Sequence, residues 1–399
     1  MSLKIPKEVD VLVVGMGPGG SGAAKRCAEL GLKVLGVEKR AEIGAPKRCG
    51  EAISRHGFTD RMGIEPVGPW IIQEVHGAIV YSPNGKHIRV DYDGPEGWVV
   101  ERKLFDKHLA GLAAMAGALI RARTEASCFR REGVRIKATL RSGDQVEDIT
   151  SKIIIAADGV ESKVARELGI NTSNKPIDLI SGFQYEMANV KTSGKHMEFF
   201  FGNEIAAGGY VWIFPKGRGI ANVGIGVRKP FASRTAKEYL DDFIRNRPEL
   251  KDGSILEVNS GGVPVGGFLE DSVADNLIVV GDAAHQVNPI HGGGIPEAYM
   301  SGKLAAEVAA EAIKANDLSK GFLKKYDKIW DEKRGKKLKK ILKLREVMES
   351  MSDDDLNWLI GYLVGEDLVD LSRSSGFTRI AKILMKKPRL IKLARKLLL

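Results

Sequence analysis

Three glycines near the N-terminus have the spacing of a site that binds a phosphate-containing cofactor. Gly15, Gly17 and Gly20 form a GxGxxG pattern directly after the apolar run Val9 to Val14. The first glycine permits a sharp turn, the second lets the backbone approach a pyrophosphate, and the third lets the next helix pack closely. The N-terminus of that helix offers free N–H groups to the phosphates. Glu38, about 20 residues further on, can accept hydrogen bonds from ribose hydroxyls, so the pattern predicts a dinucleotide site.

Two later segments indicate which dinucleotide is bound. Ile153 to Ser162 reads IIIAADGVES, and Leu277 to Ile295 reads LIVVGDAAHQVNPIHGGGI. Both resemble the second and third fingerprints of FAD enzymes related to the aromatic hydroxylases, and they occur in the same order as in that family. The resemblance implies that Asp158 and Gly159 lie near the pyrophosphate and that Asp282 contacts the ribityl chain or the adjoining phosphate. For each residue alone, a turn or helix-cap role is the alternative.

The same resemblance extends to the flavin ring. Pro289 and the run Gly292 to Gly294 would place backbone N–H groups near the pyrimidine edge, where they stabilise negative charge. Arg102, just before a predicted helix, resembles the family's flavin-contacting arginine. The residues expected to contact FAD are Gly15, Gly17, Pro18, Gly19, Gly20, Glu38, Lys39, Arg48, Cys49, Gly50, Arg102, Asp158, Gly159, Gly281, Asp282, Pro289, Gly292, Gly293, Gly294 and Ile295.

Two short motifs narrow the chemistry further. Arg48 to Glu51 reads RCGE, and Tyr210 to Pro215 reads YVWIFP, a YxWxFP strand. With these motifs the whole chain resembles the geranylgeranyl reductase family, whereas flavin halogenases have a related WxWxIP strand. The resemblance implies that hydride from reduced flavin N5, plus a proton, saturates geranylgeranyl chains of archaeal membrane lipid precursors. Two alternatives stay open: an FAD-dependent monooxygenase of an apolar substrate, and a non-catalytic flavoprotein that binds isoprenoid lipid.

The YxWxFP strand is the expected substrate wall. Tyr210, Trp212 and Phe214 alternate along it, so their rings can share one face and, with Pro215, line an apolar tunnel. An ordinary sheet core would show the same alternation. An isolated alkene needs a proton as well as hydride, and aromatic faces can stabilise the developing positive charge.

Two residues are candidate proton donors, Cys49 and His291. Cys49 lies in a loop between Gly44 and Gly50, where a thiol could approach the flavin. Because a thiol with an ordinary pKa near 8.5 is a weak acid, Cys49 could instead shape the pocket or pass on a proton from water. A buried structural role is the alternative for Cys49, and a structural role is also common for a single histidine such as His291.

The order of predicted elements indicates the fold. A strand, a glycine turn, a helix and a second parallel strand open the chain, and later segments return to the same sheet. We predict an α/β fold, α+β overall, with a Rossmann-like FAD-binding domain, an inserted antiparallel-sheet substrate domain and a helical C-terminus. Their expected ranges are 1–65, 98–172 and 270–312 for the first, 66–97 and 173–269 for the second, and 313–399 for the third. The strands expected in the inserted domain are Trp70 to Tyr81, Lys86 to Tyr92, Ser181 to Asn189, His196 to Phe201, Tyr210 to Phe214 and Ile220 to Val227.

The net charge of +10 is concentrated near the C-terminus. From Glu311 to Leu399 there are 22 Lys and Arg against 13 Asp and Glu. Phe377 to Leu399 holds eight basic and no acidic residues, with apolar side chains such as Ile380 and Leu384 on one helical face. Such a segment can bind the headgroup layer of a membrane, or it can dock on the protein with a solvated face. We expect a peripheral position on the inner face of the cell membrane, and no nucleic acid partner, because stacking aromatics are not interleaved with the basic residues.

Other sequence features restrict the location and the partners. The three cysteines show no disulfide or metal-ligand spacing, so we expect a cytoplasmic protein with no bound metal. We find no signal peptide and no apolar run long enough to cross a bilayer. There is no second glycine fingerprint for a nicotinamide cofactor, so the electron donor could be NAD(P)H or ferredoxin.

Overall fold

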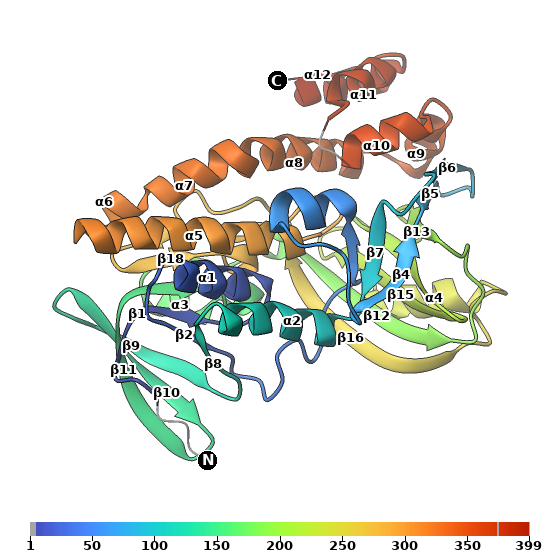
Figure 1. The fold of residues 1–399 in the computed structure, drawn as a ribbon. Coiled ribbons are helices and arrows are strands. Elements are labelled where there is room, and N and C mark those ends of the chain that lie inside the picture. The colour runs from blue at the N-terminus through green and yellow to red at the C-terminus, as the bar shows by residue number, and fades with distance from the viewer. Residues whose placement is uncertain (1–4, 373–374, 399) are drawn as a thin grey trace.

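The computed structural model of the chain describes residues 5–372 and 375–398 (Figure 1). Residues 1–4 of the predicted FAD-binding domain lie outside these ranges, as do residues 373, 374 and 399 of the predicted C-terminal region. For residues 372 and 398 the backbone alone is described.

The first sheet is built around the N-terminal strand. β1 (Glu8–Val14) pairs in parallel with β2 (Val34–Val37) and with β11 (Gln145–Ala156). β8 (Leu119–Arg121) and β18 (Leu277–Val279) extend the parallel part, giving the order β18-β11-β1-β2-β8. The central strands are almost continuous apolar runs because both faces of this part of the sheet are covered.

Two helices cover one face of this sheet. α1 (Pro18–Glu29) follows the glycine turn and packs against α5 (Ile295–Ala315) (Figure 1). A Cβ atom on Gly302 of α5 would lie 2.0 Å from the carbonyl oxygen of Gly19. The two helices can therefore approach this closely only with glycine at position 302, which places the N-terminus of α5 beside that of α1.

The remaining elements of this unit complete its edges. α2 (Arg102–Met115) packs beside α1, and Glu101 caps it by accepting a hydrogen bond from the Lys103 N–H. The other elements are β9 (Glu125–Glu132), β10 (Arg135–Ser142), α3 (Lys163–Glu167) and β17 (Val273–Ala274). The α/β fold class predicted from the sequence is confirmed, and the predicted domain boundaries stay a prediction.

A seven-stranded sheet forms the second layer. Its order is β16-β12-β15-β14-β13-β5-β6, and all its neighbouring strands are antiparallel except β13 and β5. The strands are β5 (Gly77–Tyr81), β6 (His87–Asp91), β12 (Leu179–Ala188), β13 (His196–Phe201), β14 (Tyr210–Gly217), β15 (Ile220–Arg228) and β16 (Ser254–Pro264). α4 (Ala236–Arg245) covers one face with Tyr239, Leu240 and Phe243. The rings of Tyr210, Trp212 and Phe214 lie on the other face, which is free to line a cavity.

The single strand predicted from Trp70 to Tyr81 is wrong. The segment forms two strands in different sheets, β4 (Ile71–Val75) and β5, separated at His76. β4 joins a three-stranded sheet with β3 (Ala52–Ser54) and β7 (Gly97–Val100). A Cβ on Gly77 would lie 2.0 Å from the Val90 carbonyl oxygen, so this glycine allows the close approach at which the chain changes sheets.

The C-terminal region is helical, as predicted. Its elements are α6 (Lys320–Leu323), α7 (Lys325–Trp330), the π-helical turn η5 (Asp331–Gly335), α8 (Lys336–Glu349), α9 (Asp353–Ile360), α10 (Gly365–Ser372), α11 (Phe377–Leu384), the 3₁₀ turn η6 (Pro388–Leu390) and α12 (Ile391–Leu398). Within the described ranges, no helix combines the length and the apolar character needed to cross a membrane.

The last two helices dock on the body of the protein. Ile380 and Leu384 of α11 and Leu390 of η6 are buried in one cluster with Leu344 and Val347 of α8. Figure 1 shows α11 and α12 lying over the C-terminal half of α8. The apolar face that the sequence identified is therefore covered by protein, which is the docked arrangement that the sequence left open.

Candidate active site

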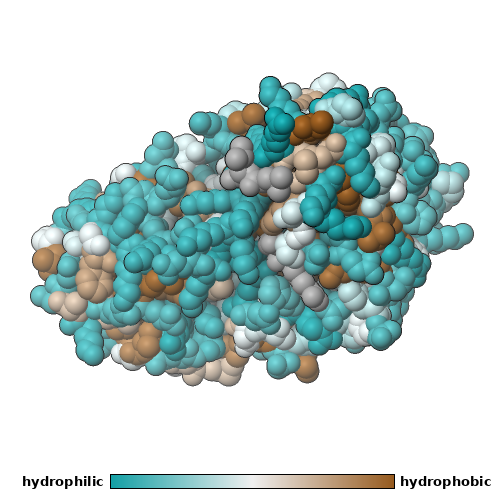
Figure 2. All heavy atoms as spheres, turned by 90° about the horizontal axis from the view of Figure 1, so that it is seen from above, coloured by the Kyte–Doolittle hydropathy of each residue, from teal (hydrophilic) through white to brown (hydrophobic). Residues whose placement is uncertain are grey.

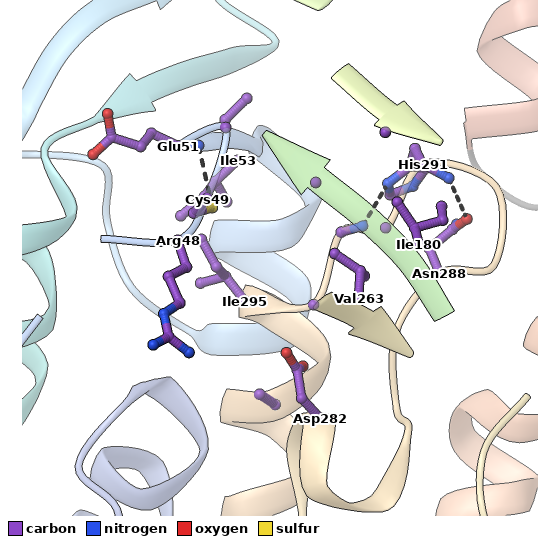
Figure 3. Close-up of a pocket in the computed structure, with 18 of the residues that line it drawn as sticks. Arg48, Cys49, Glu51, Ile53, Ile180, Val263, Asp282, Asn288, His291 and Ile295 are labelled. Carbon is purple, nitrogen blue, oxygen red and sulfur yellow. Dashed lines mark hydrogen bonds between the residues drawn. The ribbon is translucent and has the colours of Figure 1, made fainter. Parts of the chain in front are cut away.

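One cavity connects the glycine turn, the RCGE loop and the aromatic strand. Its volume is about 840 Å³, at the large end of the range for ligand sites. Figure 3 shows Asp282 and Ile295, the Cys49 loop, and Val263 with His291 arranged around the same space. All the site residues predicted from the sequence line this cavity except Gly20, Pro289 and Pro215.

The glycine turn has the geometry that its spacing predicts. Gly15 has a φ of +94°, and a Cβ there would lie 2.4 Å from the Ala157 carbonyl oxygen. A Cβ on Gly20 would lie 1.8 Å from the Gly15 carbonyl oxygen. A Cβ on Gly17, by contrast, would meet no atom of the described residues within 4 Å. Gly15 and Gly20 thus serve packing, whereas Gly17, the N-cap of α1, faces open space that suits a phosphate.

Glu38 is held next to this turn by backbone groups. Its Oε2 accepts a hydrogen bond from the Met16 N–H at 3.1 Å, and its Oε1 accepts one from the Arg40 N–H at 3.0 Å. A carboxylate oxygen can accept more than one hydrogen bond. Glu38 is therefore fixed in a position from which it can also receive ribose hydroxyls.

Asp158 provides an independent test of whether a polar cofactor fits. Its Oδ2 accepts a hydrogen bond from the Val164 N–H at 3.0 Å, while its buried Oδ1 has no partner among the residues that the structure describes. Burial raises the pKa of Asp158, and the backbone N–H of Val164 opposes that rise. The neighbouring Gly159 has a φ of +72° and open space beside it. A buried carboxylate oxygen without a partner, next to open space, fits a hydroxyl or N–H donor on a bound cofactor.

The third fingerprint forms a preshaped loop before α5. The Asn288 Oδ1 accepts hydrogen bonds from the N–H groups of Ile290 and His291 at 2.9 and 3.3 Å. Asp282 lies in the turn η4 (Gly281–Ala284), and a Cβ on Gly294, the N-cap of α5, would lie 3.0 Å from its Oδ1. Burial raises the pKa of Asp282, and the Arg102 guanidinium opposes that rise. The loop and Asp282 thus lie together at the N-terminus of α5, and their contacts with FAD stay a prediction.

Arg102 is a fixed cation beside Cys49. Its guanidinium donates two hydrogen bonds to Asp106, of 2.8 and 2.7 Å. Burial alone would lower the pKa of Arg102, but the Asp106 carboxylate and the Cys49 sulfur raise it well above its ordinary value. The half-buried Cys49 accepts a hydrogen bond at Sγ from the Glu51 N–H at 3.2 Å. The thiol, the cation and the N-terminus of α5 therefore lie around one part of the cavity.

His291 is exposed to the cavity, and its ring is oriented by the loop. Its Nδ1 accepts a hydrogen bond from the Gly293 N–H at 3.0 Å, which assigns the ring proton to Nε2 in the neutral form. Desolvation of the ring by the cavity walls, together with the positive charges of Arg61 and Arg334, lowers the pKa of His291 to about 4. The negative charge of Glu297 offsets part of this effect. The ring is neutral at pH 7 and is therefore poorly suited to donate a proton there.

A buried network of charged residues, which no sequence motif indicated, surrounds Glu51. The Glu51 side chain is 0% exposed and accepts hydrogen bonds from Lys47, Lys216 and Asn222 at 3.2, 3.0 and 2.8 Å. Its Oε1 also accepts one from the Arg102 N–H at 2.9 Å. Lys216 could have been found, because it continues the alternation of Tyr210, Trp212 and Phe214 on β14.

The C-terminal helices supply the far wall of the cavity, a role that no sequence pattern indicated. The apolar residues that line it from α8 to α11 are Ile341, Leu344, Met348, Leu356, Leu359, Ile360, Leu363, Leu368, Val369, Leu371 and Ile380. The helical spacing of those in α9 was visible in the sequence, but the surface that they face was not.

Comparisons with known proteins agree with this site. The family model for the geranylgeranyl reductase catalytic domain matches residues 178–263. The chain is 45% identical to a digeranylgeranylglycerophospholipid reductase of Methanocaldococcus jannaschii, with 98% of each chain covered. It is 42% identical to digeranylgeranylglycerophospholipid reductase 2 of Methanopyrus kandleri, covering 98% of this chain and 100% of the relative.

Solved structures support both the family and the cofactor. A geranylgeranyl bacteriochlorophyll reductase-like protein of Thermoplasma acidophilum is 38% identical, with a TM-score of 0.90 over 98% of this chain and 99% of that one. A myxobacterial FAD-dependent halogenase is 18% identical with a TM-score of 0.72 over 98% of this chain and 97% of that one, so it shares the fold. The glycine turn, Glu38 and the unpaired oxygen of Asp158 fit FAD, the cofactor that the sequence fingerprints predict. From the extent and identity of these matches, the chain belongs to the geranylgeranyl reductase family.

Proposed function

We propose that this protein saturates the carbon–carbon double bonds of geranylgeranyl chains in an archaeal membrane lipid precursor, a digeranylgeranylglycerophospholipid. The observation that carries the proposal is that an FAD-type site and an apolar wall of aromatic and aliphatic side chains lie in the same cavity. Reduced FAD supplies hydride when it is bound. The names of the relatives that match nearly the full chain support the choice of lipid.

The apolar wall suits an unsaturated hydrocarbon chain. The ring of Phe199 lies 5.8 Å from that of Tyr210 and 5.5 Å from that of Phe214, and the Tyr210 and Trp212 rings are 5.8 Å apart, centroid to centroid. The Tyr210 hydroxyl donates a hydrogen bond to the His291 carbonyl oxygen at 2.7 Å, so this polar group already has a partner within the protein. The rings can therefore exclude water and stabilise positive charge on a protonated alkene.

Cys49 is the proton donor that we propose. Its sulfur lies on the cavity wall, in the loop that adjoins both the α5 N-terminus and the aromatic strand. His291 is neutral at pH 7 and so holds no readily released proton. After each transfer the Cys49 thiolate would take a proton from water, because the conjugate base of a weakly acidic thiol is protonated again at neutral pH. If Cys49→Ser and Cys49→Ala both reduced the alkene at the wild-type rate, direct donation by Cys49 would be excluded.

We also propose that the C-terminal helices bring the cavity to an anionic membrane surface, on the cytoplasmic face. Lys382, Lys392 and Arg395 are exposed and have no acidic partner among the described residues. Met385 and Tyr362 are exposed as well, and the Lys386 ammonium lies 4.7 Å from the centroid of the Tyr362 ring. Figure 2, which looks down on these helices, shows hydrophobic patches between hydrophilic side chains. Basic residues beside exposed apolar side chains favour an interfacial position.

The membrane proposal has a test that leaves the core intact. Replacing Lys382, Lys392 and Arg395 with Glu should weaken sedimentation with vesicles of anionic phospholipid, while the thermal stability stays unchanged. Deleting Phe377 to Leu399 would be a poorer test, because it would uncover the cluster around Leu344. Unchanged sedimentation of the triple variant would exclude this surface.

The activity is tested by the mass of the product. Dithionite-reduced holoenzyme is incubated without oxygen with a digeranylgeranyl glycerophospholipid, and the lipid is analysed by mass spectrometry. Added pairs of hydrogens are expected. Unchanged lipid would contradict the proposal and support a lipid-binding protein, and lipid that gained oxygen in an aerobic run with NAD(P)H would support a monooxygenase. Comparing NAD(P)H with reduced ferredoxin in the same assay identifies the electron donor.

A further inference from the structure

The seven-stranded sheet holds the backbone of the Cys49 loop at two successive residues. The Gln184 Nε2 on β12 donates a hydrogen bond to the Cys49 carbonyl oxygen at 3.1 Å. The Asn222 Nδ2 on β15 donates to the Gly50 carbonyl oxygen at 3.2 Å, as well as to the Glu51 carboxylate. A loop that carries a candidate catalytic thiol is thus tied to the sheet that carries the substrate wall.

Gln184 connects the Cys49 loop directly to the aromatic strand. Its Oε1 accepts a hydrogen bond from the Trp212 indole N–H at 2.9 Å, while its Nε2 serves the Cys49 carbonyl oxygen. The indole can only donate and the carbonyl can only accept, so the orientation of the Gln184 amide is determined by its two partners. The side chain is 3% exposed, so water cannot replace either bond easily.

The Trp212 ring that Gln184 holds has little freedom to move. A Cβ on Gly224 would lie 2.3 Å from Cζ2 of Trp212, so the ring lies directly on the backbone of β15. A Cβ on Gly50 would lie 3.4 Å from Nε1 of Trp212 and 2.9 Å from Cε2 of Phe214. The ring is enclosed between β15 and the Cys49 loop, and Gln184 is the polar link across that contact.

We propose that Gln184 is a positioning residue that sets the placement of the Cys49 loop relative to the Trp212 wall. Gln184 lines the cavity, but both polar atoms of its side chain are taken up by the Cys49 carbonyl and the Trp212 indole, so it acts through Cys49 and Trp212. The consequence for catalysis rests on the proposed function: the placement of the loop decides which segment of the hydrocarbon chain lies beside Cys49, and hence which double bond is reduced efficiently. The amide is suited to this role because it donates to one partner and accepts from the other.

Three variants break the link in different ways. Gln184→Glu keeps an oxygen acceptor for Trp212 but places a second oxygen against the Cys49 carbonyl, so only the loop side is lost. Gln184→Leu removes both bonds, and Trp212→Phe removes only the bond on the wall side. Tyr185→Phe is the matched control, because Tyr185 is the next residue of β12 and its hydroxyl donates to Asp241, at 2.9 Å, away from the loop.

The first measurement is the rate at which iodoacetamide alkylates Cys49 in the FAD-loaded protein. The background is Cys128→Ser, since Cys128 is exposed, whereas Cys27 is buried and burial raises its pKa to about 12. A buried hydrogen bond that is lost should loosen the loop and change the rate by about fivefold or more in Gln184→Glu. Tyr185→Phe should alkylate at the wild-type rate.

The second measurement is the position of the double bonds that are saturated at partial conversion. The Gln184 variants should lower kcat and redistribute the saturated positions, with the dissociation constant of FAD unchanged within about twofold. If Gln184→Glu showed the wild-type alkylation rate and the wild-type product pattern, the proposal would be overturned. This outcome decides the question even if Gln184→Leu does not fold. If the wild-type enzyme reduced no lipid, the proposed function would fail, while the alkylation rates would still decide whether Gln184 positions the loop.

Discussion

The Nζ of Lys216 lies 3.0 Å from the Oε2 of Glu51, and neither side chain is more than 5% exposed. Burial alone would raise the pKa of Glu51, but the ammonium groups of Lys216 and Lys47 outweigh it and lower the pKa. This ion pair joins the end of the aromatic strand to the RCGE loop, so it connects the two motifs that distinguish the family.

Removing Lys216 should destabilise the protein strongly. Lys216→Met leaves Glu51, Glu101 and Glu186 with less positive charge around them, and a buried ion pair that loses one partner costs about 3–5 kcal/mol. We expect a lower midpoint of urea unfolding, monitored by circular dichroism. Lys237→Met is the control, since the pair between Lys237 and Asp241 on α4 is exposed and should contribute nothing measurable. Equal unfolding midpoints for the two variants would contradict this view of the network.

Substitutions at two glycines of the turn should have different effects, one on the stability of the fold and one on FAD binding. Gly15→Ala puts a side chain at a φ of +94° and 2.4 Å from a carbonyl oxygen, so it should destabilise the fold by about 1–3 kcal/mol or more even without cofactor. Gly17→Ala meets open space and has an ordinary φ of −70°, so the fold should be unaffected. It should instead weaken FAD binding by at least about tenfold, because the methyl group occupies the phosphate space. Thermal unfolding of the apoprotein and titration with FAD measure the two effects.

Features of the fold that depend on a few neighbouring residues could be predicted from the sequence, whereas features that depend on contacts between distant segments could not. The turn at Gly15 and the loop before α5 were predicted because a glycine turn is set by the backbone over a few residues. The segment from Trp70 to Tyr81 was misread because its β propensity is continuous, while the change of sheet at His76 depends on a close approach to β6. Such a contact has no local signature.

In the candidate site, too, residues within short motifs could be predicted, and residues that depend on contacts between distant segments could not. Cys49, Asp282 and the aromatic strand were found because each belongs to a compact motif. Gln184 was missed, because a single glutamine within a strand has no pattern until β12, β14 and the Cys49 loop meet. The amphipathic period of α11 was visible, but the sequence could not decide whether membrane or α8 covers the apolar face.

His291 should not govern the pH dependence of catalysis near neutral pH. Since its pKa is lowered to about 4, the ring is neutral from pH 5 to pH 8, and His291→Gln should keep the shape of the wild-type rate profile over that range. The rate of lipid-dependent reoxidation, measured by stopped flow after anaerobic reduction, is the test. A profile whose acidic limb near pH 6.5 disappeared in His291→Gln would show that the ring titrates at its ordinary pKa and takes part.

The same shift has a consequence for stability. A histidine whose pKa is lower in the folded state binds fewer protons than in the unfolded chain, so folding loses stability as the pH falls from about 6.5 toward 4. His291→Gln should therefore unfold with a shallower dependence on pH across this window. Urea unfolding at several pH values checks the slope, and identical slopes for the variant and the wild type would contradict the shift.

Asp355 should hold the last two helices on the body of the protein. It accepts hydrogen bonds from Lys387 at 2.7 Å and from the Nε of Arg389 at 2.8 Å, and it also forms the capping box of α9 with Ser352. Burial alone would raise the pKa of Asp355, but these partners lower it to about 2. The stabilisation is therefore complete above the unfolded pKa of about 3.9 and is lost as the pH falls toward 2.

The substitution Asp355→Asn should release α11 and α12 at neutral pH without unfolding the FAD-binding sheet. The amide lacks the charge that attracts Lys387 and Arg389, so the amides of residues 377–397 should exchange with solvent faster, by about tenfold, while those of β1 and β11 keep their protection. Hydrogen–deuterium exchange with mass spectrometry resolves the two regions. Asp354→Asn, at an exposed position in the first turn of the same helix, is the control. Because Leu359 and Ile380 line the cavity, release of these helices should also raise the KM for lipid; an unchanged KM together with faster exchange would show that the far wall is not needed for substrate binding.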